Sequence, residues 1–165
     1  MQFNLLVHLT AALIPLIIGF IWYNPKVLGT LWMKESGMTT EKIGKPNPLI
    51  FLWCYLASFL IALMLTPMVI HQFGFYSVLY GEPGFEEPTS ELGKYISDFM
   101  VNYGNNFRTF KHGVLHGTIN ALLLITPVIG INAMFEKKSF KYVMIHAGYW
   151  VLCLAIMGGI ICQFS

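Results

Sequence analysis

The chain has 165 residues, of which 56% are hydrophobic and only 11% are charged, with a formal net charge of +2. A soluble domain has about 25% charged residues, so these charges are too few to cover a water-facing surface. The composition excludes an ordinary soluble domain and indicates that most of the surface faces lipid. The small net charge gives no indication of nucleic-acid binding.

Four apolar runs follow one another along the chain, at residues 5–23, 49–70, 110–135 and 142–164. About 20 apolar residues span the hydrocarbon core of a bilayer. Backbone polar groups in lipid must be hydrogen-bonded within the chain, so each run is predicted to be a helix. We therefore expect residues 1–165 to form a single all-α domain, an integral membrane four-helix bundle.

The loops between these runs differ in charge. The first loop (24–48) and the third (136–141) together hold seven of the ten Lys and Arg residues, namely Lys26, Lys34, Lys42, Lys45, Lys137, Lys138 and Lys141. The second loop (71–109) is longer and holds five of the eight carboxylates. Basic loops tend to stay in the cytoplasm. We expect the first and third loops there, and both termini and loop 71–109 outside.

The second loop also contains a helical pattern. Between residues 90 and 103 the apolar positions are spaced three and four apart: Leu92, Tyr95, Ile96, Phe99, Met100 and Tyr103. That spacing places them on one face of a helix, which is too short to span a bilayer. We predict a short outward-facing surface helix at 90–103, lying on the membrane or over the mouth of the bundle.

The third run begins with two interleaved pairs of residues. His112 and His116 are four apart, so they share one face of a helix, and Asn120 continues that face one turn deeper. Gly113 and Gly117 form a GxxxG step, which allows another helix backbone to approach closely. We expect a close helix–helix contact at these two glycines.

The fourth run has its own small-residue step, Ala155 and Gly159, which predicts a packing face. It also carries a polar residue, His146, at a depth similar to that of Asn132 in the third run. Polar groups within a membrane need a partner and are candidates for function. The alternative is an interhelical hydrogen bond between His146 and Asn132.

Four of the five histidines fall near the outer side in this topology: His8, His71, His112 and His116. Imidazole is a ligand for zinc, copper and haem iron. If the chain has a functional site, we expect it to include His112 and His116, with His8 or His71 as a further partner. The alternative is that each histidine separately contacts water or lipid head groups. The residues do not specify a cofactor.

Several stretches resemble a known family. They are Gly19–Pro25 with its Trp-Tyr-Asn-Pro segment, Lys111–Gly117, Gly130–Glu136, and Gly148-Tyr149. Together they resemble the bacterial membrane family named domain of unknown function 1761, over nearly the whole chain. The resemblance implies a four-helix protein of the bacterial inner membrane, and it implies no activity.

Three functions remain open. There is no phosphate-binding glycine loop, nucleophile elbow or intramembrane acid pair, so we do not expect an enzyme. The first hypothesis is an accessory or structural subunit that associates with a larger membrane complex or with itself. The second is a small-molecule or ion-binding transport protein. The third is a metal or haem protein that uses the outer histidines.

Overall fold

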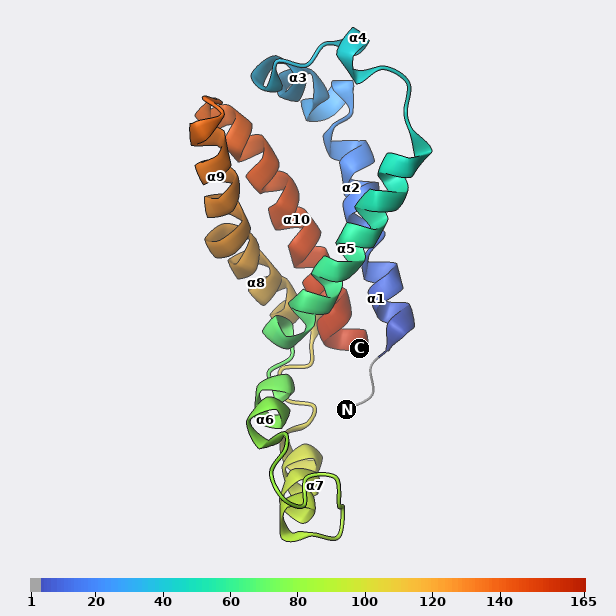
Figure 1. Cartoon of the computed structure of the whole chain (residues 1–165), viewed down its shortest axis with the longest axis vertical. Coiled ribbons are helices and arrows are strands. Elements are labelled where there is room, and N and C mark those ends of the chain that lie inside the picture. Colours follow the sequence, from blue (N-terminus) through green and yellow to red (C-terminus); the bar gives the residue numbers. More distant parts are fainter. Residues whose placement is uncertain (1–3) are drawn as a thin grey trace.

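The computed structural model describes residues 4–165, and all the regular structure in that range is helical (Figure 1). Four stretches are long and apolar enough to cross a membrane: Leu5–Trp22, Pro48–Val69, Phe110–Phe135 and Phe140–Phe164. The chain is therefore an all-α protein of four membrane-spanning helices, as its composition predicts.

The first stretch contains α1 (Leu5–Ala11) and α2 (Ile14–Trp22). A proline ring clashes with the carbonyl four residues earlier, and α1 ends at Ala11, four residues before Pro15. The first loop then forms η1 (Pro25–Gly29), a turn of π-helix, followed by α3 (Thr30–Ser36) and α4 (Thr40–Ile43).

The second stretch is one helix, α5 (Pro48–Val69), which ends two residues after Pro67. Ile70 has extended backbone, with φ −118° and ψ 99°, and α6 (Gln72–Leu79) and α7 (Glu91–Tyr103) follow. The third stretch consists of α8 (Phe110–Asn120), the π-helical η2 (Ala121–Ile125) and α9 (Thr126–Phe135). The fourth is a single helix, α10 (Phe140–Phe164).

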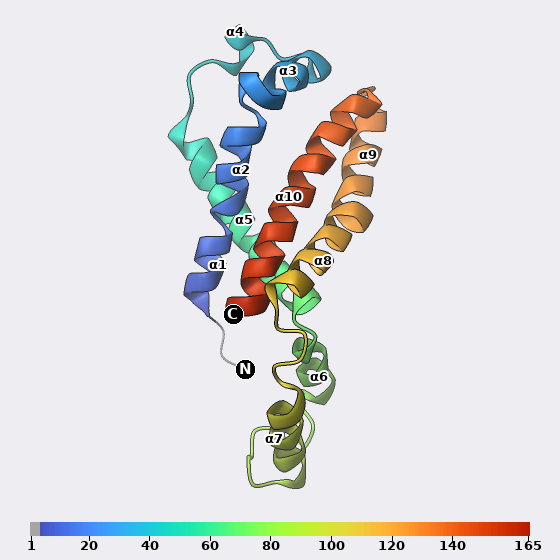
Figure 2. The same cartoon turned by 180° about the vertical axis from the view of Figure 1, so that it is seen from behind.

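Helix α10 is the centre of the bundle. In its most apolar window 56% of the residues are buried, against 11% for the stretch formed by α8, η2 and α9. In both views α10 lies between α1 and α2 on one side and α8 and α9 on the other, and α5 crosses it obliquely (Figures 1 and 2). The core gathers on its C-terminal half, where Met157 and Ile161 pack against Leu65 and Val69 of α5.

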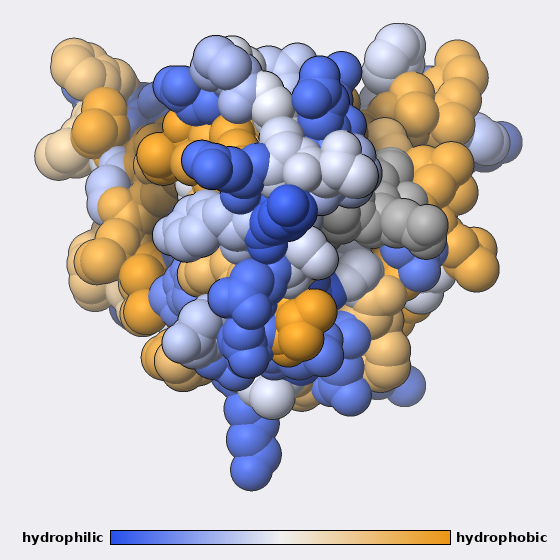
Figure 3. Space-filling view, turned by 90° about the horizontal axis from the view of Figure 1, so that it is seen from below, coloured by the Kyte–Doolittle hydropathy of each residue, from blue (hydrophilic) through white to orange (hydrophobic). Residues whose placement is uncertain are grey.

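Helices α6 and α7 form an arm that extends beyond the end of the bundle where α1 begins and α10 ends (Figures 1 and 2). The Phe75 and Phe99 rings stack between them, with centroids 3.8 Å apart and planes 10° apart. Seen from the end of the arm, hydrophilic residues gather at the centre and hydrophobic ones around the edge (Figure 3). The spacing at 90–103 predicts α7 but not α6, and α7 packs on α6 instead of covering the mouth of the bundle.

The two basic loops meet at the opposite end. The Lys138 ammonium donates to the Ser36 carbonyl at 2.7 Å, and the Ser139 hydroxyl donates to the Glu35 carboxylate. The lysine-rich loops therefore share one end of the molecule, and the acidic arm occupies the other.

Candidate metal centre

Helices α8 and α10 touch backbone to backbone. A Cβ added at Gly113 would lie 2.1 Å from the Gly158 carbonyl oxygen, and one at Gly117 would lie 2.0 Å from that of Leu154. Ala155 is 9% exposed on the same side of α10, and a Cβ at Gly159 would lie 2.5 Å from the Phe110 ring. Small residues on both helices make this approach possible, and it holds the N-terminal half of α8 rigidly in place.

Three histidines meet beside this crossing. His112 and His116 lie one turn apart on α8, and His71 reaches them from the link between α5 and α6. Ring centroids are 4.5 Å apart for His112–His116, 4.9 Å for His71–His112 and 4.8 Å for His71–His116. One ring nitrogen from each residue can be chosen so that all three lie within 4.8 Å of one another.

The histidine cluster, His71, His112 and His116, is close to the geometry of a metal site. The Nε2 atoms of His71 and His112 are 2.9 Å apart, so one ring donates a hydrogen bond to the other. Three nitrogens on a tetrahedral zinc ion lie about 3.3 Å from one another, given Zn–N bonds of about 2.0–2.1 Å. A nitrogen–nitrogen separation of 4.8 Å would have to shorten by about 1.5 Å to reach that spacing. His71 is exposed to solvent, which leaves one side of the site open.

Phe107 lies over the cluster, with its ring 5.1 Å from that of His112 and 6.2 Å from that of His71. Its φ of 61° is unusual for a residue other than glycine and costs about 1–3 kcal/mol, which the surrounding structure must offset. Gln72, 5% exposed, helps to fix this segment by donating to the carbonyls of Tyr103 and Asn106, at 3.1 and 3.0 Å. Neither Phe107 nor Gln72 is signalled by the sequence pattern, beyond lying within a few residues of His112 and His71.

His8 is not part of the histidine cluster. It is fully buried, with Nε2 2.7 Å from the Thr66 hydroxyl and Nδ1 2.8 Å from the Asn4 carbonyl. It therefore connects α1 to α5. The expected depth of His8 does not determine which way its helix faces, and this helix turns His8 into the core.

His146 and Asn132 lie at the other end of the bundle. In the structure of residues 4–165, no hydrogen bond joins their side chains. The His146 Nδ1 is 2.8 Å from the Tyr23 hydroxyl, and its buried Nε2 has no hydrogen-bond partner within the described chain. Both residues line a pocket of about 170 Å³ beside the turn between α9 and α10, together with Glu136 and Tyr142.

Asn120 lies next to the histidine cluster without joining it. Its side-chain amide donates to the His116 carbonyl at 2.8 Å. It also lines an apolar groove of about 230 Å³ between α5 and η2, which includes Met64 and Met68. Its position supports the backbone of α8 and supplies no ligand to the three histidines.

The comparisons with known proteins identify a family and assign no reaction. No curated protein and no solved structure matches the chain. A family model described as "Protein of unknown function (DUF1761)" matches residues 6–162. That stretch covers nearly all of the four membrane-spanning helices and the whole arm, and so the chain belongs to the DUF1761 family.

Proposed function

We propose that this protein binds one first-row transition-metal dication, zinc or copper, through His71, His112 and His116. The observation that carries the proposal is that one ring nitrogen from each residue lies within 4.8 Å of the other two. Imidazole suits both ions. Of the three hypotheses open from the sequence, this geometry favours the metal protein.

The cluster is built from two parts of the chain, which distinguishes it from a chance pair on one helix. His71 and His112 are 41 residues apart in sequence, and α8 is held by the glycine contacts with α10. A metal site needs ligands that are fixed relative to one another, and α8 supplies two of the three on a single face.

The exposed side of the cluster points to an open coordination position. Three protein ligands and one exchangeable ligand are typical of zinc sites that act on or exchange a bound molecule. Haem fits poorly, because three imidazoles in mutual contact leave no space between them for the macrocycle. We therefore infer that the site binds an exchangeable ion that is not part of a haem, with water or an external ligand in the fourth coordination position.

The proposed location follows from the lysines. With the first and third loops in the cytoplasm, both termini and the arm lie on the outer side of the inner membrane. The histidine cluster then lies at the outer end of the third membrane-spanning stretch. A role as a subunit of a larger complex is compatible with this location and is part of the proposal.

The test is metal binding by the purified protein. Wild type and the variants His71→Ala, His112→Ala and His116→Ala are titrated with ZnCl₂ and CuCl₂ in detergent by calorimetry. We expect one ion per chain for the wild type and an affinity at least about tenfold lower for each variant, since even groups that only orient ligands contribute 10–100-fold. His146→Gln is the control, because it removes an imidazole at the opposite end of the bundle.

Equal affinity of wild type and all three variants would exclude the cluster as the metal site. Folding is checked by thermal unfolding, and His71→Ala is the most informative variant because that side chain is exposed. Protein taken gently from native membranes is also examined for bound metal and for co-purifying chains. Recovery of the chain alone, without partner or self-association, would contradict the subunit role and leave the metal proposal intact.

A further inference from the structure

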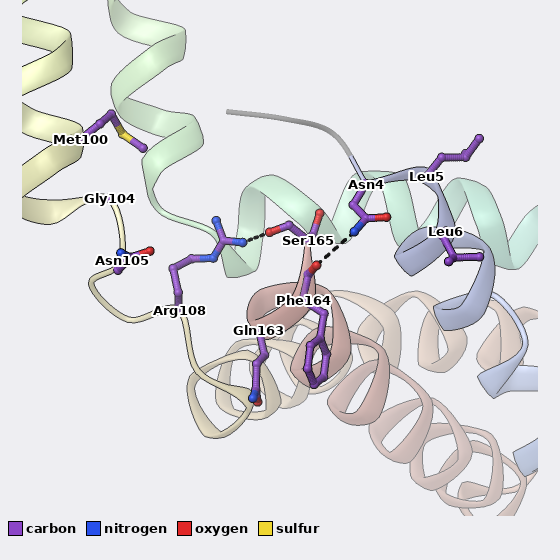
Figure 4. A pocket seen from close by; sticks show the side chains of 10 residues that line it. All are labelled: Asn4, Leu5, Leu6, Met100, Gly104, Asn105, Arg108, Gln163, Phe164 and Ser165. Carbon is purple, nitrogen blue, oxygen red and sulfur yellow. Dashed lines mark hydrogen bonds between the residues drawn. The ribbon is translucent and has the colours of Figure 1, made fainter.

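A second site lies at the same end of the bundle, in a pocket of about 970 Å³. The pocket is an open hollow lined by the start of α1, the end of α10, and Met100 of α7 with the segment that follows it (Figure 4). Arg108, the single arginine of the chain, extends into it from that segment. The proposed metal site does not use this pocket.

Arg108 has hydrogen-bonding capacity to spare. Its Nε donates to the Cys162 carbonyl at 2.8 Å, and one terminal nitrogen donates to the Ser165 carbonyl. These bonds cap the last turn of α10. A guanidinium has five N–H groups, and its other terminal nitrogen points away from Ser165 (Figure 4). Burial lowers the pKa of Arg108, which means that the charge lacks full solvation and gains from a nearby anion.

The other polar side chains in the lining are uncharged. Asn4, Asn105 and Gln163 also line the pocket (Figure 4), and the amides of Asn4 and Gln163 bond to the Phe164 carbonyl and the Phe110 N–H. No Asp or Glu side chain lines the pocket within the described chain. A guanidinium matches the oxygens of a phosphate better than an ammonium does, because its donors form a planar fork. The pocket therefore has the chemistry of a phosphate site.

The apolar side of the pocket indicates where that phosphate comes from. Leu5, Leu6 and Phe164 line it and are 51%, 72% and 58% exposed. They lie at the ends of the first and fourth membrane-spanning stretches, where polar head groups meet acyl chains. We propose that this pocket binds an anionic phospholipid, with its phosphate on Arg108 and an acyl chain along Leu5, Leu6 and Phe164.

The test compares two variants, each of which introduces one carboxylate. Asn105→Asp places a negative charge in the pocket and leaves the Arg108 cap intact, whereas Asn106→Asp adds the same charge at an exposed neighbour outside the lining. The full chain in detergent is titrated with phosphatidylglycerol and phosphatidylcholine, and bound lipid is counted by native mass spectrometry. We expect phosphatidylglycerol to bind the wild type more tightly, Asn105→Asp to weaken it about tenfold, and Asn106→Asp to weaken it less than about threefold.

A second arm identifies the source of the phosphate. Inorganic phosphate is added at the same concentrations and should neither bind measurably nor displace the lipid, because it lacks acyl chains. Equal binding of inorganic phosphate, with the same loss in Asn105→Asp, would overturn the lipid as occupant. Equal binding of both lipids, or an equal effect of both Asp variants, would overturn the site itself. Metal affinity should be unchanged in Asn105→Asp, so failure here is separable from failure of the metal proposal.

Discussion

Individual glycines decide how closely α8 and α10 pack. At Gly117 the Leu154 carbonyl occupies the space that a methyl group would need, whereas nothing lies within 4 Å of a Cβ placed on Gly130. The same substitution therefore has opposite expected effects at two positions of one membrane-spanning stretch.

We predict that Gly117→Ala destabilises the protein by about 1–3 kcal/mol, because the backbones must separate to admit the methyl group. Gly130→Ala is its control and should be neutral or stabilising by up to about 1 kcal/mol, the helix-propensity difference between Ala and Gly. Thermal unfolding in one detergent, followed by tryptophan fluorescence, measures both. Indistinguishable midpoints for Gly117→Ala and the wild type would contradict the close contact.

At the scale of elements, prolines shape the spanning helices and aromatic rings join the arm. Pro15 lies just after the break between α1 and α2, and Pro127 follows the π-helical turn η2, whose Ala121 carbonyl accepts from the Thr126 hydroxyl at 2.9 Å. Such a turn can take up the backbone disturbance that a proline causes. In the arm, by contrast, Phe75, Tyr95 and Phe99 join two short helices by ring contacts.

We predict that Phe99→Ala loosens the arm without affecting the bundle. A stacked aromatic pair contributes about 0.5–1.5 kcal/mol beyond its buried area, and short helices depend on such packing. Amide hydrogen exchange should speed up in α6 and α7 and stay unchanged in α5 and α10. Val101→Ala is the control, since Val101 is 81% exposed on the same helix, and a matching increase there would show that the ring contact is not responsible.

At the scale of the whole molecule, basic and acidic residues gather at opposite ends of the protein. Seven of its ten basic residues lie in the first and third loops, and five of its eight carboxylates lie in the segment that contains the arm. Those two loops contact each other, so the asymmetry belongs to the two ends of the folded protein.

We predict that the lysine-rich end is cytoplasmic. Cysteines introduced at Lys45 and Thr89, both exposed, should react differently with a membrane-impermeant maleimide in intact cells. Thr89→Cys should be labelled and Lys45→Cys protected until the membrane is opened, each measured against the parent chain with its own cysteines. The reverse pattern would invert the topology and move the histidine cluster to the cytoplasmic side.

The sequence was sufficient for the four membrane-spanning helices but only partly for the site. Hydropathy and length identify the four spanning stretches, and the GxxxG step marks the face of α8 that lies on α10. The expected depth in the membrane was the same for His8 and His71. Depth does not define the rotation of a helix about its axis, and in the structure His8 faces Thr66. Helix α6 was not predicted, because its residues lie in the loop that follows the second apolar run. The Tyr23 partner of His146 comes from the opposite end of the chain, and no local pattern connects the two.

The position of His71 affects the conformational entropy of the arm. An ion shared by His71 and His112 would close the intervening chain into a ring, because the two residues are 41 positions apart. Such a metal cross-link acts as a disulfide does. It reduces the number of conformations available to the unfolded chain and so favours the folded state. The α6–α7 arm lies wholly within that ring. Metal occupancy and chelation would therefore tighten and release an extramembrane segment that itself carries no ligand.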